Sequence, residues 1–287
     1  MTKRSIVPSA LVCAAIVGVY FPVLSSLVRQ WASDENYSHG FIIIPFAVYF
    51  AWQKRRALET APAQPSNAGL LFVGASLIVL LAGLLGAELF LTRISLIGVL
   101  AGSIWFLFGW KHLRLLAFPL LLLFLMIPLP AMIFNQIAFP LQLVASRCGE
   151  LALSAAQVPV LREGNVITLA NTTLEVAEAC SGIRSLVSLL TLAIIYGYVT
   201  DSRTWVRVAL ALSSIPVAVI ANGVRVAGTG IAAHFFGSAA AEGFFHTFSG
   251  WLVFAVAFAM LLAIQQSLSS VAARTPAMAP APAEVHV

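Results

Sequence analysis

Residues 68–87 read AGLLFVGASLIVLLAGLLGA, a run without a single charged side chain. An α-helix needs about 20 mostly apolar residues to cross the hydrocarbon core of a bilayer. The run is continuously apolar rather than alternating, and lipid offers no water to satisfy the backbone, so a helix is favoured over a barrel strand. This stretch therefore predicts a transmembrane helix.

The rest of the chain has the same character. Its 287 residues are 60% hydrophobic and 9% charged, with a mean hydropathy of +0.96. Soluble domains carry about 25% charged residues, so the composition excludes a soluble globular protein. We expect an all-α polytopic membrane protein with about eight transmembrane helices. The expected spans are 6–28, 39–53, 68–87, 94–110, 115–134, 182–200, 208–236 and 246–266.

The pattern changes between the fifth and sixth expected spans. Residues 135–157 carry apolar side chains at helical spacing with some polar ones, which favours an interfacial helix; a weak ninth span is the alternative. Two β-rich pieces then flank a turn at Asn171, namely Val166–Leu169 and Thr173–Val176, and predict a small β-hairpin. The hairpin is too polar to lie in lipid.

These features define the expected domain organisation. Residues 1–266 form a single transmembrane domain, within which 135–177 is the interfacial helix and hairpin. The Ala- and Pro-rich residues 267–287 form a disordered cytoplasmic tail.

The charge of each loop predicts its side of the membrane. The net charge is +5. When the N-terminus is placed in the cytoplasm, most Lys and Arg residues fall in cytoplasmic loops and most Asp and Glu residues in outer loops. Cytoplasmic loops of membrane proteins are enriched in Lys and Arg. We therefore expect an N-in, C-in protein with 135–177 on the outer face, and we interpret the basic residues as topology signals rather than a nucleic-acid surface.

The stretch EVAEACSGIRSL, residues 175–186, places a cysteine among charged residues at the start of an apolar helix. The topology puts Cys180 at the outer mouth of the sixth span, Arg225 in the seventh and His246 at the outer mouth of the eighth. Consecutive helices usually pack side by side, so these three groups can meet. The chain has no CxxC pair and no Cys/His cluster with zinc-ligand spacing, so neither a metal nor a cofactor is expected.

These three side chains suit nucleophilic catalysis. A thiolate is the reactive form of cysteine, and helix N-terminal amides favour an anion at Cys180. His246 can take or share the thiol proton, and Arg225 can stabilise an oxyanion or a substrate carbonyl. Charge inside a span is costly, so Arg225 is a functional candidate; its alternative is an ion pair with Glu178 or Glu242.

Other polar residues are expected to surround and orient this set. Glu242 lies four residues before His246, and Asn222 lies three before Arg225, which places each pair on one helix face. Glu178 and Arg184 flank the cysteine and can pair with each other. His39, in YSHGF near the second span, is a rival base. A disulfide between Cys148 and Cys180 remains an alternative for the thiol.

At these residues the chain resembles the exosortase/archaeosortase family of membrane cysteine enzymes. The pieces that carry the resemblance are YSHGF, REGNVITL, LEVAEACSGIRSL, ANGVRV and EGFFHTFSGW, which together span about residues 37 to 266. The resemblance implies a Cys–Arg–His set at Cys180, Arg225 and His246, with a histidine as in bacterial members.

The resemblance also implies a function. An exosortase is a thiol protease and transpeptidase of the bacterial inner membrane, with its active site facing the periplasm. It cleaves PEP-CTERM sorting signals, in which a short motif precedes an apolar helix and a basic tail, and passes the secreted protein through a thioester to an acceptor such as a lipid amine. Two alternatives stay open: a transporter or polysaccharide-export component, because intramembrane charges also mark transport pathways, and a peptidase that only hydrolyses.

Overall fold

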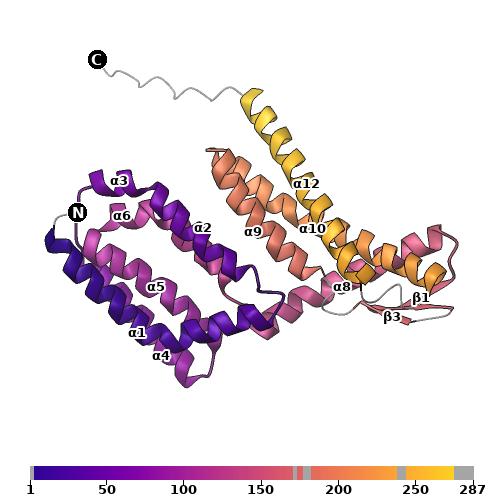
Figure 1. The fold of residues 1–287 in the computed structure, drawn as a ribbon, viewed down its shortest axis with the longest axis horizontal. Coiled ribbons are helices and arrows are strands. Elements are labelled where there is room, and N and C mark those ends of the chain that lie inside the picture. Colours follow the sequence, from indigo (N-terminus) through magenta and orange to yellow (C-terminus); the bar gives the residue numbers. More distant parts are fainter. Residues whose placement is uncertain (1–2, 171–172, 177–181, 238–243, 275–287) are drawn as a thin grey trace, which may run out of the picture. The chain divides into compact units, whose positions relative to one another are not determined.

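The computed structural model describes residues 3–170, 173–176, 182–237 and 244–274. The chain divides into two compact units, Met1–Phe134 and Asn135–Val287, which we call the N-terminal and C-terminal units. Each is helical, and the described strands belong to the C-terminal unit (Figure 1).

The N-terminal unit contains long apolar helices joined by short ones. Its elements are α1 (Lys3–Ser33), α2 (Gly40–Gln53), α3 (Arg55–Thr60), α4 (Asn67–Leu85), α5 (Leu89–Phe108), α6 (Trp110–Leu115), α7 (Ala117–Leu122) and the 3₁₀ helix η1 (Leu123–Met126). Helix α8 (Ala131–Ala155) begins at the boundary between the units.

Helices α4 and α5 form an antiparallel hairpin whose backbones touch. A Cβ atom built on Gly69 would lie 2.6 Å from Cα of Phe106, and one built on Gly102 would lie 2.9 Å from the backbone nitrogen of Val73. Lipid is as apolar as leucine, so transmembrane helices associate through close packing at small residues rather than through hydrophobic burial. The glycines are therefore what allows this hairpin to close.

Buried polar contacts connect α1 to the rest of the unit. The Tyr20 and Ser95 hydroxyls are 2.9 Å apart, and Trp31 Nε1 donates to the carbonyl oxygen of Met126 at 2.9 Å. Both aromatic side chains are almost fully buried. A buried polar group costs free energy unless it is hydrogen-bonded, so these pairs fix the position of α1 against α5 and η1.

The C-terminal unit begins with α8 and a three-stranded antiparallel sheet in the order β1-β2-β3. The strands are β1 (Val160–Glu163), β2 (Val166–Leu169) and β3 (Thr173–Glu175). Strands β2 and β3 confirm the predicted hairpin. Strand β1 was missed because VLRE is short and polar, yet it pairs along its whole length with β2.

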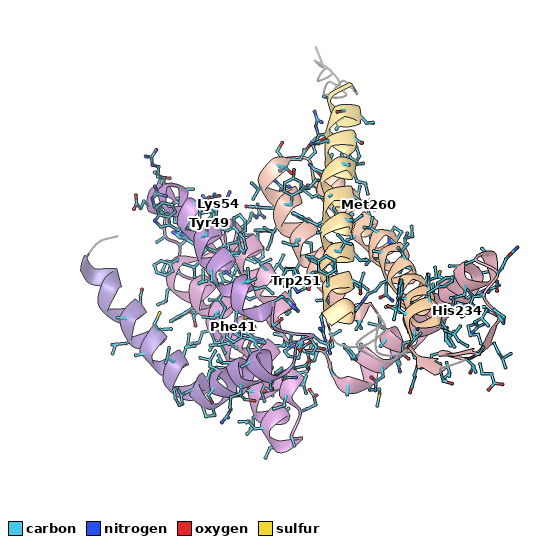
Figure 2. The ribbon with its side chains drawn as sticks, turned by 45° about the vertical axis from the view of Figure 1, so that its right-hand side comes forward. Phe41, Tyr49, Lys54, His234, Trp251 and Met260 are labelled. Carbon is cyan, nitrogen blue, oxygen red and sulfur yellow. The ribbon has the colours of Figure 1, made fainter. Side chains whose placement is uncertain are left out.

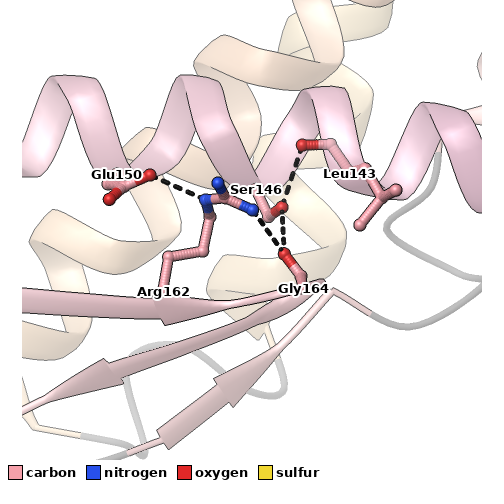
Figure 3. Close-up of polar contacts among 5 residues, drawn as sticks. All are labelled: Leu143, Ser146, Glu150, Arg162 and Gly164. Carbon is pink, nitrogen blue, oxygen red and sulfur yellow. Dashed lines mark hydrogen bonds and ion pairs between the residues drawn. The ribbon is translucent and has the colours of Figure 1, made fainter.

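Polar contacts hold the sheet to α8 (Figure 3). Arg162 Nε donates to Glu150 at 2.7 Å, and its Nη1 donates to the carbonyl oxygen of Gly164 at 2.8 Å. Ser146 Oγ, which is fully buried, donates to the same carbonyl at 3.0 Å. Apolar residues of the sheet, including Ile167 and Leu169, pack with Leu153 of α8. The sheet is thus a fixed platform on α8.

Three long helices complete this unit and pack together: α9 (Ile183–Thr200), α10 (Thr204–Phe236) and α12 (Phe244–Arg274) (Figure 1). Their shared core includes Leu189, Leu210 and Leu261. At one end of the bundle Gln265 donates to the Thr200 hydroxyl at 3.0 Å, and Ser269 donates to the Asp201 carboxylate at 3.2 Å. These contacts join the end of α9 to α12.

Among the described residues, six helices are long and apolar enough to cross a membrane, namely α1, α4, α5, α9, α10 and α12, and a bent helix pair could add a seventh span. Their outward side chains are apolar and exposed, as Trp251 and Met260 of α12 illustrate (Figure 2). The chain is therefore a multi-pass membrane protein. Two of the eight expected spans do not form single helices of spanning length. The 39–53 span is the 14-residue helix α2, and the 115–134 span is broken into α7 and η1, which reach span length only together with α8.

Two further boundaries differ from the expectation. Helix α12 continues to Arg274, so residues 267–274 are helical rather than part of a disordered tail. Residues 275–287 lie outside the described residues. Helix α8 covers residues 135–155 of the expected 135–157 helix and begins four residues earlier, at Ala131.

The α4–α5 hairpin yields a stability prediction. We expect Gly69→Leu to lower the unfolding free energy by about 1–3 kcal/mol or more, because the new side chain would overlap the Phe106 backbone. Gly74→Leu in the same helix is the matched control, since a Cβ there meets nothing within 4 Å. Thermal unfolding of the two purified variants in detergent measures the difference, and equal midpoints would contradict this account of the hairpin.

Candidate functional site

The candidate site is built around Gly182, which precedes α9. Its φ of +78° is in the left-handed region, which L-residues with side chains rarely adopt. Cys180 lies two residues earlier, in segment 177–181 outside the described residues, as does Glu178. The described residues on either side of this segment are Val176, which follows strand β3, and Gly182, which precedes α9.

Gly182 packs directly on α10. A Cβ atom built on it would lie 2.7 Å from Cγ and 2.9 Å from Nδ2 of Asn222. Asn222 is 5% exposed and sits in the middle of α10. A small cavity of about 10 Å³, enough for roughly one water molecule, lies between the same residues and Leu141 of α8. The turn that follows Cys180 is therefore held against the centre of the bundle.

Arg225 lies about one turn beyond Asn222 and faces α12. A Cβ atom built on Gly250 would lie 3.4 Å from Nη2 and 3.5 Å from Cζ of Arg225. The missing side chain at Gly250 thus leaves room for the guanidinium. His246 belongs to the first turns of the same helix, four residues before Gly250, a spacing that places both residues on one helix face.

The contacts of Asn222 and Arg225 bring three helices together. The start of α9 and the early turns of α12 both contact the middle of α10. The side chain of His246 and all of Glu242 lie outside the described residues, so the structure places their helix but not their contacts. Arg184 lies in the first turn of α9 and is partly buried.

Helix α8 also packs against this part of α10. The sequence did not indicate that contact. A Cβ atom built on Gly223 would lie 2.9 Å from Cβ and 3.2 Å from Sγ of Cys148. Cys148 is a free cysteine in the structure, and it packs beside Asn222 on the α10 backbone. The pairing of two small residues, Cys148 with Gly223, was detectable only once the fold was known.

A family model for transmembrane exosortase (Exosortase_EpsH) matches residues 31–263 of the chain. The chain belongs to the transmembrane exosortase family. The match covers both units and includes all the residues that carry the candidate site. Comparisons with curated proteins and with solved structures find no match. Family membership indicates a membrane transpeptidase type of role for this exosortase.

The rival base of this exosortase, His39, has its own structural environment in the N-terminal unit. It lies in the turn before α2, and its Nε2 donates to the carbonyl oxygen of Leu125 at 3.1 Å. Burial lowers the pKa of His39 below its usual value, and backbone hydrogen bonds to Leu125 and Asn36 partly offset that effect. This ring is therefore neutral at pH 7, with one nitrogen engaged in holding η1 against the turn.

The described residues contain no group of three or more His, Cys, Asp or Glu side chains arranged to hold a metal. The described part of the site contains two side chains that can donate hydrogen bonds. The Asn222 amide and the Arg225 guanidinium suit an oxyanion or a carbonyl oxygen.

The Gly182 contact predicts a measurable strain. Gly182→Ala should lower the unfolding free energy through two effects: the positive φ, which costs about 1–2 kcal/mol for an L-residue, and the overlap with Asn222. Gly164→Ala is the matched control for the first effect, because Gly164 has a φ of +64° and nothing within 4 Å of its Cβ position. Thermal unfolding should show the larger loss for Gly182→Ala, and adding Asn222→Ala should recover part of it. Equal losses at both glycines would argue against the contact.

His39 predicts a pH dependence. Because its folded pKa is below the unfolded value of about 6.5, its contribution to stability is complete above that value and falls as the pH drops and the unfolded state takes up the proton. His39→Gln removes this titration. The decline in unfolding midpoint between about pH 7 and about pH 5 should therefore be smaller for the variant than for the wild type. An unchanged decline would show that burial of His39 has no energetic consequence.

Proposed function

We propose that this exosortase is a cysteine transpeptidase that cleaves PEP-CTERM-type C-terminal sorting signals at the outer face of the bacterial inner membrane. One observation carries the proposal. Gly182, two residues after Cys180, packs on Asn222, and Gly250, four residues after His246, packs on Arg225. The described neighbours of the proposed thiol and imidazole therefore contact α10 three residues apart, which supports a shared site.

Cys180 is the proposed nucleophile. Its thiolate attacks the carbonyl carbon of the scissile peptide bond, and the carbonyl oxygen takes the negative charge. Cys180 precedes the N-terminus of α9, where the positive end of the helix dipole favours an anion. A cysteine with an ordinary thiol pKa of about 8.5 is only a few per cent ionised at neutral pH, so this help increases the reactive fraction.

Arg225 and His246 act on the two ends of the reacting bond. The guanidinium donates to the oxyanion, and Asn222 on the same face holds or assists it. His246, protonated when the thiol is deprotonated, gives its proton to the leaving amine as the carbon–nitrogen bond breaks, leaving a thioester on Cys180. Glu242 and Glu178, with Arg184, are proposed to orient these groups.

The second half-reaction releases the product. An amine acceptor, such as a lipid headgroup amine, attacks the thioester carbonyl while His246 takes its proton. The carbon–sulfur bond then breaks and the Cys180 thiolate is regenerated. Water in place of the amine gives simple hydrolysis. The substrate's apolar helix lies in the membrane, so its motif is delivered at the interface where the polar site lies.

Substitution of the cysteine tests the proposal. Cys180→Ala and Cys180→Ser should each reduce processing of a reporter carrying the sorting signal by at least about 1,000-fold, because the thioester cannot form. Cys148→Ala is the matched control and should retain processing, since Cys148 packs against Gly223 in the same unit without a proposed chemical role. Immunoblotting for uncleaved reporter, at equal enzyme levels in the membrane, measures the effect.

Substitution of each histidine separately tests which one, His246 or His39, acts as the base. His246→Ala should abolish processing, whereas His39→Gln should retain it. Loss with His39→Gln alone would overturn the assignment of the base. Normal processing by both Cys180 variants would overturn the enzyme proposal and favour a transport role.

A further inference from the structure

The N-terminal unit contains a basic cavity that the proposed chemistry does not use. The cavity measures about 390 Å³, within the roughly 300–1,000 Å³ typical of small-molecule sites. It lies between α3 and α6, near the C-terminal end of α5. The residues that line it are Ala57, Thr60, Ala61, Pro62, Lys111, Arg114 and Leu115.

The walls of this basic cavity are held by several contacts. His112, which is buried, donates through Nε2 to the carbonyl oxygen of Leu58 at 3.2 Å and so ties α6 to α3. The linker between α3 and α4 is tied to the end of α5, because the backbone nitrogen of Gln64 donates to the Phe108 carbonyl at 3.0 Å. Gly109, with a φ of +92°, allows α6 to turn away against Gln64. The cavity is thus part of the fold rather than a gap between loose loops.

Two exposed cations border the cavity, whose lining surface is otherwise mostly apolar. Lys111 and Arg114 line it and are exposed, and neither forms an ion pair with a described residue. Glu59 is the single acidic residue in 54–66 and 109–117, and the Lys-Arg-Arg sequence at 54–56 lies outside the cavity lining. A guanidinium and an ammonium group one helical turn apart suit a phosphate group.

The surroundings point to lipid rather than to a soluble anion. Trp52 and Trp110 are 57% and 51% exposed, and tryptophan is enriched where a membrane meets water. Arg55 lies 3.9 Å above the Trp52 ring and Arg114 lies 5.9 Å from the Trp110 ring. Lys54 and Tyr49 mark the same end of α2 (Figure 2). Ala57, Pro62 and Leu115 give the cavity an apolar wall beside its charges.

We propose that this basic cavity binds the phosphate headgroup of an anionic phospholipid, with Lys111 and Arg114 on the phosphate and the glycerol and upper acyl chains along the apolar wall. Basic sites between helices on the cytoplasmic side of membrane proteins bind such headgroups, and the expected topology puts this end in the cytoplasmic leaflet. The lipid would anchor α3 and α6 at the interface, independently of catalysis.

Lipid retention by the purified full-length protein tests the proposal. Native mass spectrometry after exchange into mixed micelles should show phosphatidylglycerol bound in preference to phosphatidylcholine. Lys111→Gln with Arg114→Gln should weaken phosphatidylglycerol retention by about tenfold or more. Arg55→Gln with Arg56→Gln removes the same charge outside the lining and should change retention by less than about threefold. Ala57→Trp, which fills the cavity without altering charge, should reproduce the loss at an unchanged unfolding midpoint.

The remaining outcomes would overturn the proposal. Equal losses of phosphatidylglycerol retention in the two double variants would mean that diffuse surface charge, rather than the cavity, binds the lipid. Full retention by Ala57→Trp would exclude the cavity as the site. Displacement of the lipid by glycerol 3-phosphate at millimolar concentration would identify a soluble phosphate site instead. The readout is binding, so none of these results depends on the chemistry proposed for Cys180.

Discussion

Close contact at glycine is the constraint on which both units depend, with a neighbouring backbone in the N-terminal unit and with side chains in the C-terminal unit. In lipid there is little hydrophobic gain from bringing helices together, so stability comes from close packing and from internal hydrogen bonds. Gly69 on Phe106 closes the α4–α5 hairpin, and Gly182 on Asn222, Gly223 on Cys148 and Gly250 on Arg225 assemble the C-terminal bundle. At three of these contacts, the space left by a missing side chain is occupied by a polar or reactive group.

The two ends of the C-terminal bundle have different roles. At one end Thr200, Asp201, Gln265 and Ser269 bond to one another across helices and keep α9 and α12 together. Polar groups that satisfy each other in this way stabilise a membrane bundle. At the other end Asn222 packs on Gly182 before α9, and Arg225 packs on Gly250 of α12. The polar contacts at the first end thus help to fix the geometry of the second.

The sequence alone predicted the helices that consist of long apolar runs, and it drew attention to charged residues inside those runs. Residues 68–87 became α4 almost unchanged, and the guanidinium in the middle of an apolar helix made Arg225 a candidate whose role stays a prediction. The prediction failed for two other elements. The apolar run at 115–134 is broken because Pro128 and Pro130 end the helix at Ile127, a local signal that hydropathy does not register. Strand β1 forms only because β2 lies beside it, so it depends on tertiary context. The packing of Cys148 on Gly223 could not be predicted without the relative positions of α8 and α10.

The arrangement of helix starts has an electrical consequence. Helices α9 and α12 both begin near the groups that contact α10: Gly182 is the N-cap of α9, and Gly250 lies about 9 Å along the axis from the first residue of α12. Each helix start carries about half a positive charge. Two such starts and one guanidinium place positive charge beside adjoining turns of α10 before any reaction begins. A negative charge that forms on a group held against these turns is therefore stabilised without any reorganisation of the helices.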